Sequence, residues 1–349
     1  MVRAIEWVDA EAPHIRLIDQ TMLPLCEEYL EVSTVDALVD AIQRLVVRGA
    51  PALGAAGGLG VVLAMHQAAR DGWGEEQLAD GIRSIRDARP TAVNLAWGAD
   101  RVDAMRKAGI DVALAEALAI VAEDEAANRA LSKLGADWVL SKITHRPLRA
   151  ITHCNTGALA TSAWGTGYGI LHELHDRGVL ELVYVDETRP LLQGTRLTSW
   201  ELGRDGIDHV VQTDGAAAST VLRGLVDFAV IGADRITANG DAANKIGSVS
   251  VALACKDAGI PFIVAAPYST VDENTATGGE IEIEERSADE VLTLGGIRLA
   301  APGARAFNPA FDVTPHRLIS AIVTERGVVE PADSSTPVFA PGGTDVTDD

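Results

Sequence analysis

Apolar and polar positions follow two different patterns along the chain. In the first third, apolar residues recur every three or four positions, as in Val35, Leu38 and Ile42, which predicts amphipathic helices. The run 52–70 has so many small residues that its backbone is expected to pack closely on a neighbour. We expect short strands or a hairpin within 4–32, and helices over 33–47, 76–87, 91–107 and 112–134.

The pattern changes at residue 149, where short apolar runs begin to alternate with helical stretches. Strands are expected at 149–153, 181–187, 208–213, 226–232 and 261–267, and helices at 158–175, 195–203, 216–224, 246–258 and 315–326. Alternating strands and helices predict a parallel sheet with right-handed crossovers. The expected fold class is therefore α/β: a mostly helical N-terminal domain over 1–135, a Rossmann-like parallel-sheet domain over 136–330, and a disordered tail over 331–349.

Composition narrows the class of partner. The 349 residues carry a formal net charge of −21, which argues against nucleic acid or an anionic membrane surface as a partner. Cys26, Cys154 and Cys255 are odd in number and far apart, unlike a secreted disulfide framework. The first residues do not resemble a signal peptide, and no apolar run approaches ~18 residues. We expect a cytoplasmic protein that binds a small molecule.

The segment 232–248 carries the strongest candidate chemistry. It follows an apolar strand, so Asp234 is expected at the strand's carboxyl end, where α/β sheets bind ligands. Asn239-Gly240 predicts a tight turn, and Asn244-Lys245 is expected to open a helix whose first amides attract an anion. Asp234 is a candidate general acid or base. The alternative is that it pairs with Arg235 or caps the following turn.

Cys154 is the second candidate, because it follows a predicted strand within the polar segment HCNTG and precedes a predicted helix. Such a position favours a reactive thiolate, although a free cysteine is more often a small buried hydrophobe. Arg48, Arg89 and Lys245 are candidate phosphate ligands and Gln193 is a further polar candidate at an element junction; for any single Arg the alternative is a solvated or structural ion pair. The His172 and His175 spacing lacks a third ligand, and no complete nucleotide-binding motif is present, so neither segment predicts a metal or dinucleotide site.

Several motifs occur together and carry a family resemblance. They are VVRGAPALG (46–54), ARPTAVNLAW (88–97), THCNTGALAT (152–161), DETRPLLQGTRLTSWEL (186–202) and GADRITANGDAANKIGS (232–248), supported by segments 15–24, 213–219 and 307–327. Together they resemble the methylthioribose-1-phosphate isomerases over nearly the whole chain except the tail. Gly215 departs from the expected pattern within 213–219 and affects only the local loop geometry.

The resemblance implies an isomerase of methionine salvage that converts 5-methylthioribose 1-phosphate to 5-methylthioribulose 1-phosphate without metal or nucleotide. It assigns catalysis to Cys154 and Asp234. It also implies a homodimer. The substrate contacts that it implies are Arg48, Gly49, Ala50, Arg89, Gln193, Asn244 and Lys245.

Two other functions remain open from the sequence. The superfamily includes ribose-1,5-bisphosphate isomerases, so the substrate could be that sugar or 5-deoxyribose 1-phosphate. It also includes regulatory subunits of translation initiation factor 2B, so the chain could be a non-catalytic protein that binds a sugar phosphate or nucleotide. A second phosphate would require a second cationic cluster, and a regulatory protein would have no reason to keep both Cys154 and Asp234.

Overall fold

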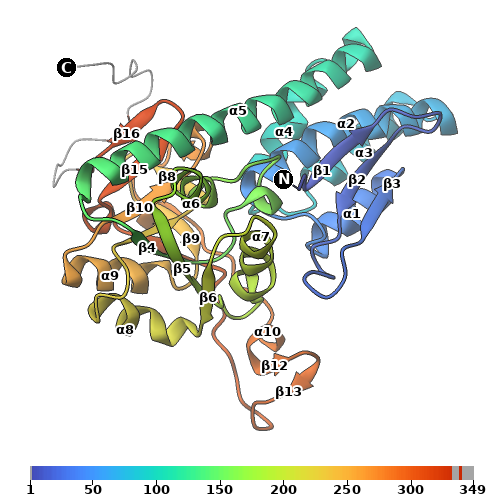
Figure 1. Ribbon diagram of the computed structural model, residues 1–349. Coiled ribbons are helices and arrows are strands. Elements are labelled where there is room, and N and C mark those ends of the chain that lie inside the picture. The colour runs from blue at the N-terminus through green and yellow to red at the C-terminus, as the bar shows by residue number, and fades with distance from the viewer. Residues whose placement is uncertain (1, 332–337, 340–349) are drawn as a thin grey trace. The chain divides into compact units, whose positions relative to one another are not determined.

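The computed structural model describes residues 2–331 and 338–339 (Figure 1). The described residues form two compact units, an N-terminal unit of residues 2–129 with 156–165 and a C-terminal unit of residues 130–155 with 166–331 and 338–339. Helix α5 (Ile110–Lys142) supplies residues to both. The domain limits expected from the sequence stay a prediction, and the expected disordered tail lies outside the described residues except at 331, 338 and 339.

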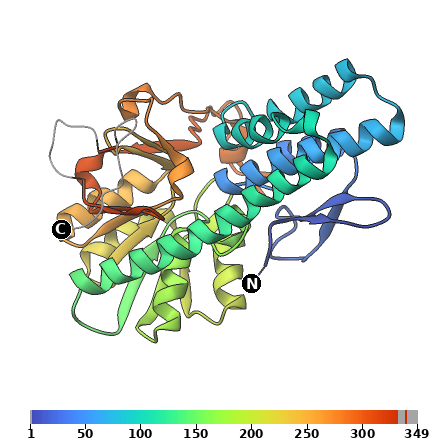
Figure 2. The same cartoon turned by 90° about the horizontal axis from the view of Figure 1, so that it is seen from above.

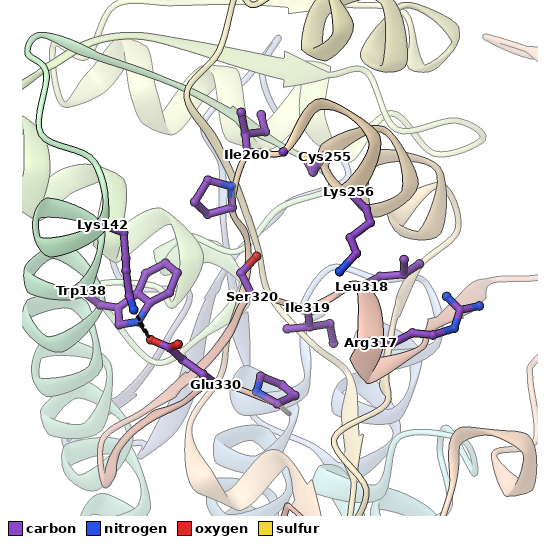
Figure 3. Close-up of a pocket in the computed structure, with 13 residues that line it drawn as sticks. Trp138, Lys142, Cys255, Lys256, Ile260, Arg317, Leu318, Ile319, Ser320 and Glu330 are labelled. Atoms are coloured by element: carbon purple, nitrogen blue, oxygen red, sulfur yellow. Dashed lines mark hydrogen bonds and ion pairs between the residues drawn. The ribbon is translucent and has the colours of Figure 1, made fainter. Parts of the chain in front are cut away.

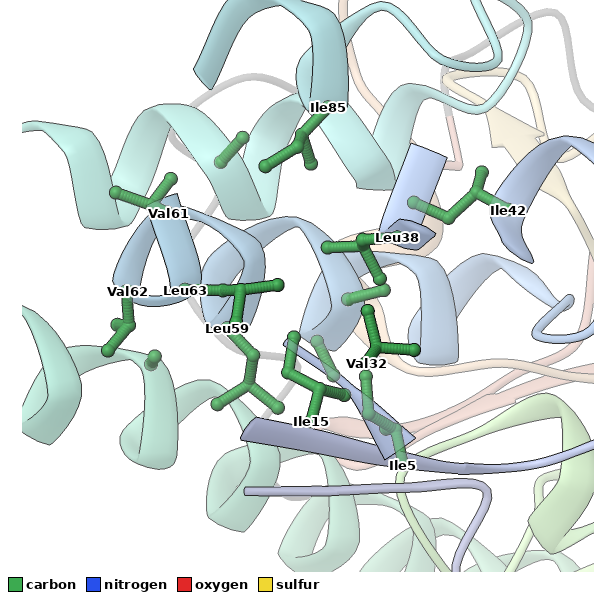
Figure 4. Close-up of a cluster of buried hydrophobic side chains, with 14 of the residues drawn as sticks. Ile5, Ile15, Val32, Leu38, Ile42, Leu59, Val61, Val62, Leu63 and Ile85 are labelled. Carbon is green, nitrogen blue, oxygen red and sulfur yellow. The ribbon is translucent and has the colours of Figure 1, made fainter. Parts of the chain in front are cut away.

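The N-terminal unit combines a small sheet with helices. The strands form an antiparallel sheet in the order β1, β2, β3. Thr34 caps the first helix by accepting a hydrogen bond from Ala37 N at 3.3 Å, as its sequence position suggests. The core joins Ile5, Ile15 and Leu38 to the central helix (Figure 4). The elements are β1 (Ile5–Val8), β2 (His14–Ile18), β3 (Tyr29–Val32), α1 (Val35–Gln43), α2 (Ala50–Asp71), α3 (Glu75–Arg86), α4 (Val93–Asp103), the short helix η1 (Arg106–Ala108) and the first part of α5.

Helix α2 is the core of this unit. It is long and apolar enough to cross a membrane, but 83% of its most apolar window is buried within the protein. A Cβ on Gly57 would collide with the carbonyl of Leu95, and one on Gly98 with the backbone of Gly54. The small residues therefore let α2 and α4 approach closely, as expected from the sequence; Figure 2 shows the helices of this unit side by side.

The main sheet of the C-terminal unit has seven strands in the order β16-β15-β10-β7-β4-β5-β6. All neighbours are parallel except β15 and β16. Numbered by their order in the chain, the six parallel strands lie 3-2-1-4-5-6 across the sheet, the order of doubly wound nucleotide-binding sheets. The strands are β4 (Leu148–Thr152), β5 (Leu180–Asp186), β6 (His209–Gln212), β7 (Phe228–Ile231), β10 (Phe262–Ala265), β15 (Ala321–Thr324) and β16 (Gly327–Val329).

Helices bury both faces of this sheet. Val230 belongs to one apolar cluster, with α6 and α7, while its neighbours Ala229 and Ile231 belong to another, with α8 and α9. Successive strand residues point to opposite faces, which explains why these strands are continuous apolar runs in the sequence. The helices are α6 (Gly167–Asp176), α7 (Ser199–Arg204), α8 (Ala217–Leu222) and α9 (Ser248–Ala258).

Two expectations about this unit are wrong, and the extent of a third is overestimated. The expected helix over 315–326 is instead the short helix η7 (His316–Leu318) followed by β15, whose four residues are all buried. Asn244 and Lys245 do not open a helix, because they end strand β9 and helix α9 starts only at Ser248. The expected helix over 158–175 is also shorter: residues 158–160 form the short helix η2, and α6 starts at Gly167.

Strand β9 belongs to a second sheet that the sequence did not predict. Its strand order is β11-β8-β9-β14, formed by β8 (Arg235–Thr237), β9 (Ala242–Lys245), β11 (Val271–Asp272) and β14 (Phe311–Thr314). Antiparallel pairing with β14 holds Lys245 opposite Phe311. The remaining elements are the short helices η3 (Gly194–Thr198, a π-helix), η4 (Asp214–Ala216), η5 (Tyr268–Thr270), η6 (Gly278–Glu280) and α10 (Asp289–Leu292), and the hairpin β12 (Thr293–Leu294) and β13 (Ile297–Arg298).

Candidate active site

The two candidate catalytic residues follow neighbouring strands. Strand β4 lies between β5 and β7, and the hydroxyl of Thr152 at its end donates a hydrogen bond to the carbonyl of Val230 in β7, at 2.8 Å. Cys154 comes just after β4 and Asp234 just after β7. The connections that follow β4 and β7 cross to opposite faces of the sheet. The crevice between the carboxyl ends of these two strands is therefore the topological switch point, where such sheets bind ligands.

The backbone at Cys154 adopts an unusual conformation. Its φ is 65°, in the left-handed region, and its side chain is buried. Thr188, in the loop after β5, also has a positive φ of 63°. The two residues are joined, because Cys154 N donates a hydrogen bond to Thr188 Oγ1 at 2.9 Å, and Thr198 Oγ1 donates to the carbonyl of Cys154 at 2.6 Å. Non-glycine residues held in this region cluster at functional sites.

Asp234 is half-buried in the short connection between β7 and β8. Its backbone N–H donates to the carbonyl of Ala243 at 2.9 Å, which ties it to strand β9. Asn239 and Gly240 form the predicted tight turn between β8 and β9, where Gly240 has a φ of 84° and its N–H donates to Thr237 O at 2.8 Å. The hairpin thus brings Asp234 beside the strand that ends in Asn244 and Lys245.

Asn244 and Lys245 are buried polar residues at the end of β9. Asn244 Nδ2 donates to Ser248 Oγ at 2.9 Å. The ammonium of Lys245 donates to the carbonyl of Ala310 at 2.7 Å and lies 4.4 Å from the centre of the Phe311 ring. A buried ammonium next to a carbonyl and an aromatic face is a suitable group for binding an anion.

Gln193 is buried with only 6% of its surface exposed. Within the described residues, its Oε1 is a buried acceptor that receives no hydrogen bond. Gln193 comes directly before the π-helical turn Gly194–Thr198, and such turns occur frequently at functional sites. An unsatisfied buried acceptor is costly, so Gln193 is suited to receive a hydrogen bond from a ligand hydroxyl.

The other predicted substrate contacts lie in the N-terminal unit. Arg48 and Arg89 are half-buried, and both make interactions within the protein. Gly49 caps helix α2 with a φ of 93°, and Ala50 is the first residue of that helix. A Cβ on Gly49 would collide with the backbone of Ala160, so this position requires glycine. The role of these four residues in substrate binding stays a prediction.

The sequence did not single out a buried histidine and aspartate beside Cys154. His153 and Asp186 are each about 1% exposed, and His153 Nδ1 lies 3.1 Å from Asp186 Oδ2. His153 directly precedes Cys154, and Asp186 is the last residue of β5. The only indication in the sequence was that each residue lies at the end of a predicted strand. That the two side chains meet follows from the pairing of β4 with β5, which the structure shows.

One cavity lies at the opposite end of the sheet. It has a volume of about 760 Å³, and its lining includes Pro261 and Ser320, which directly precede β10 and β15 (Figure 3). Lys142, at its rim, forms an ion pair with Glu330 at 2.6 Å. The catalytic candidates follow the carboxyl ends of parallel strands, whereas this cavity adjoins their amino ends. None of the predicted site residues lines it.

Comparison with known proteins shows the family. Residues 46–331 match the initiation factor 2 subunit family. The methylthioribose-1-phosphate isomerase of Anaeromyxobacter dehalogenans is 51% identical over 315 residues, 90% of each chain. A probable bifunctional methylthioribose-1-phosphate isomerase/methylthioribulose-1-phosphate dehydratase of Nocardia farcinica is also 51% identical, over 92% of this chain but only 58% of the relative.

Two solved structures have the same fold over almost their whole length. The 5-methylthioribose 1-phosphate isomerase of Pyrococcus horikoshii matches with a TM-score of 0.84 and 39% identity, covering 95% of this chain and 93% of that one. A protein of A. fulgidus described as translation initiation factor eIF-2B, subunit delta, matches with a TM-score of 0.83 and 38% identity, covering 95% and 96%. The chain belongs to the initiation factor 2 subunit family and, within it, to the methylthioribose-1-phosphate isomerases.

Proposed function

We propose that this chain converts 5-methylthioribose 1-phosphate to 5-methylthioribulose 1-phosphate in methionine salvage, with Cys154 and Asp234 as the catalytic pair. The observation that carries the assignment of the pair is their placement after β4 and β7, two hydrogen-bonded neighbours at the switch point of the sheet. Relatives of this name that are about half identical to the chain support the reaction. Under this proposal the C-terminal unit is a Rossmann-like catalytic domain, and the active form of the protein is a cytoplasmic homodimer.

The reaction requires an acid and a base. A sugar phosphorylated on its anomeric oxygen cannot open its ring spontaneously, so the ring oxygen must first receive a proton. We assign this proton to Asp234. As the bond between C1 and the ring oxygen breaks, C1 becomes electron-deficient and the hydrogen on C2 becomes acidic.

Cys154 then acts as the base. Its thiolate takes the proton from C2, which leaves an enediol phosphate with a double bond between C1 and C2. Return of a proton to C1, with loss of the hydroxyl proton on C2, gives the ketone and leaves the phosphate on C1. Transfer of the C2 hydrogen to C1 as hydride is the alternative route from the same ring-opened species.

Binding is assigned to the remaining polar groups. In the part of the chain that the structure describes, Gln193 Oε1 is buried without a hydrogen bond, and it would accept one from a sugar hydroxyl. Lys245 and Asn244 are buried at the end of β9 and would contact the anionic end of the substrate. Arg48, Gly49, Ala50 and Arg89 complete the predicted contacts.

The test is a direct assay with three substrates. Purified protein is incubated with 5-methylthioribose 1-phosphate, ribose 1,5-bisphosphate or 5-deoxyribose 1-phosphate, and the ketose product is measured. We expect the highest kcat/KM with the methylthio sugar. A higher value with the bisphosphate or the 5-deoxy sugar would reassign the substrate, and binding of all three without turnover would indicate a regulatory protein instead.

A further inference from the structure

His153 is a buried histidine between two hydrogen-bond acceptors. Its Nδ1 lies 3.1 Å from Asp186 Oδ2, and its Nε2 lies 2.8 Å from the carbonyl oxygen of Ile246. A peptide carbonyl can only accept, so Nε2 must carry a proton. The contact with the carboxylate also requires a proton between Nδ1 and Oδ2. The pair therefore holds two protons in all.

Burial raises the pKa of the Asp186 carboxyl, but the hydrogen bonds and charges around the pair place the second proton on the ring. Burial alone would lower the pKa of His153, but the hydrogen bond and negative charge of Asp186, with Asp214 and the carbonyl of Ile246, raise it above its ordinary value. The other oxygen of Asp186 accepts a hydrogen bond from Gln212 Nε2 at 2.9 Å, which favours the carboxylate. Asp312, from strand β14, also interacts with the ring; burial raises its pKa, and its Oδ2 accepts hydrogen bonds from the N–H groups of Gly247 and Val249.

The same groups are spaced like metal ligands, but their hydrogen bonds explain the cluster without a metal. The ligand atoms of His153, Asp186 and Asp214 lie within 4.8 Å of one another. However, the carboxylate of Asp214 accepts from the backbone N–H groups of Thr188 and Arg189, both at 2.7 Å. A ring that donates from both nitrogens has no lone pair for a metal. We therefore interpret the cluster as an ion pair with a neighbouring carboxylate.

The ring of His153 joins segments that carry the candidate site. It belongs to the loop after β4, contacts the end of β5 through Asp186, and contacts Ile246, the residue after Lys245. Gly247 leaves room for the ring, since a Cβ there would lie 2.7 Å from His153 Cε1. One side chain thus fixes the segment containing Cys154 relative to the end of β9.

We propose that His153, held as an imidazolium by Asp186, is a positioning residue that fixes Cys154 relative to Asn244 and Lys245. This role rests on the proposed function. If the His153–Asp186 pair lost a proton to solvent, the lone pair on one ring nitrogen would face an acceptor, and one of the two contacts would break. The ion pair therefore keeps both contacts intact across the pH range in which a solvent-exposed histidine becomes neutral.

The kinetic test uses Asp186→Asn, which keeps the shape and an acceptor oxygen but removes the negative charge. Without that charge the imidazolium loses its proton at lower pH. We expect kcat to fall by about 10²-fold near pH 8, the order of loss caused by a misplacement of about 1 Å, with a much smaller change in KM. As the pH is lowered towards 6, the His153 ring of this variant regains its proton, so kcat should recover in part. His153→Gln should lose activity at every pH.

The chain offers a matched control on its surface. His145 Nε2 lies 2.9 Å from Asp227 Oδ1, and the His145 side chain is 60% exposed. His145→Gln should leave kcat and its pH profile unchanged. If Asp186→Asn keeps the wild-type kcat and pH profile, the positioning role is overturned. If its kcat falls by the same factor at every pH, the role of the negative charge is overturned.

A second measurement does not depend on turnover. In protein labelled with ¹⁵N-histidine, correlation of ring protons and nitrogens should show both nitrogens of His153 protonated at pH 7.5, and His153→Gln identifies the signals. A single protonated nitrogen would overturn the imidazolium. If the wild type shows both protons but does not isomerise the substrate, the proposed function is wrong, and with it the positioning role, while the ion pair stands.

Discussion

The hydroxyl of Thr152 donates a hydrogen bond to the carbonyl oxygen of Val230, at 2.8 Å. This bond joins the carboxyl ends of β4 and β7, the strands that lead to Cys154 and Asp234. Neighbouring strands lie about 4.8 Å apart, so the two loops begin side by side. The tertiary structure thereby places side by side the starts of two loops whose candidate residues are eighty positions apart in the sequence. Several testable consequences follow from the groups around them.

Gln193 should affect binding more than stability. Replacing it by Met removes a buried acceptor that has no hydrogen bond in the described protein but keeps the side-chain length. Loss of one hydrogen bond to the substrate costs about 1.4 kcal/mol, so KM should rise by about tenfold. The melting temperature should stay the same or increase. A fall in melting temperature with unchanged KM would show that the amide is structural.

Gly49 should be intolerant of any side chain. Gly49→Ala would place a methyl group against the backbone of Ala160 and force a residue with a Cβ into a φ of 93°. We expect a loss of about 1–3 kcal/mol in the free energy of unfolding, measured by urea titration. Gly72→Ala is the matched control, because Gly72 also has a positive φ, of 71°, but no atom of the described residues lies within 4 Å of its added Cβ. Equal losses in both variants would exclude the collision.

Asp241 should make stability depend on pH on the acidic side. Burial would raise its pKa, but hydrogen bonds from the His316 backbone, Asn239, the His316 ring and the Gly278 backbone lower it below its usual value. A lowered pKa means that the ionised carboxylate stabilises the folded protein above the unfolded pKa of 3.8, and that this contribution is lost as pH falls through the folded pKa.

The test for Asp241 is the variant Asp241→Asn. It should lose about 2 kcal/mol of stability at pH 7, and this difference from the wild type should shrink as the pH approaches 3. Thermal unfolding of both proteins across this range measures it. A difference that is constant with pH would show that the contribution is not linked to ionisation of Asp241.

Solvent deuterium should distinguish the two routes of hydrogen transfer. If Cys154 carries the C2 hydrogen as a proton, exchange with solvent before return to C1 should place deuterium at C1 of product made in D₂O. Mass spectrometry of early product measures the incorporation. Complete absence of solvent deuterium would argue against a proton exchanged through Cys154 and favour hydride transfer.

The sequence predicted the central strands well because both faces of each are buried. The run 228–232 is apolar throughout and ends in a polar loop, so the position of Asp234 could be inferred. The helix expected over 315–326 was wrong. It was predicted because four apolar residues there have helical spacing: Leu318, Ile319, Ile322 and Val323. The buried pairing of β15 with β10 determines the strand instead, and no local pattern contains that information.

The small sheet and the ion pair could not be predicted for a similar reason. Strand β9 is short and ends in polar residues, and it is stabilised by pairing with β14, which lies more than sixty residues further along the chain. His153 and Asp186 become partners only because β4 and β5 are neighbours. Motif resemblance predicted Cys154, Asp234 and Gln193, but not the buried groups that hold their loops.

The most direct test of the account is the kinetics of Cys154→Ser and Asp234→Asn with 5-methylthioribose 1-phosphate. Each variant removes one proton-transfer group while nearly preserving its shape, so kcat should fall by about 10³-fold or more. Calorimetry should show that the substrate still binds with nearly wild-type affinity. Near-normal kcat in either variant, with intact binding, would contradict the assignment of that residue to catalysis.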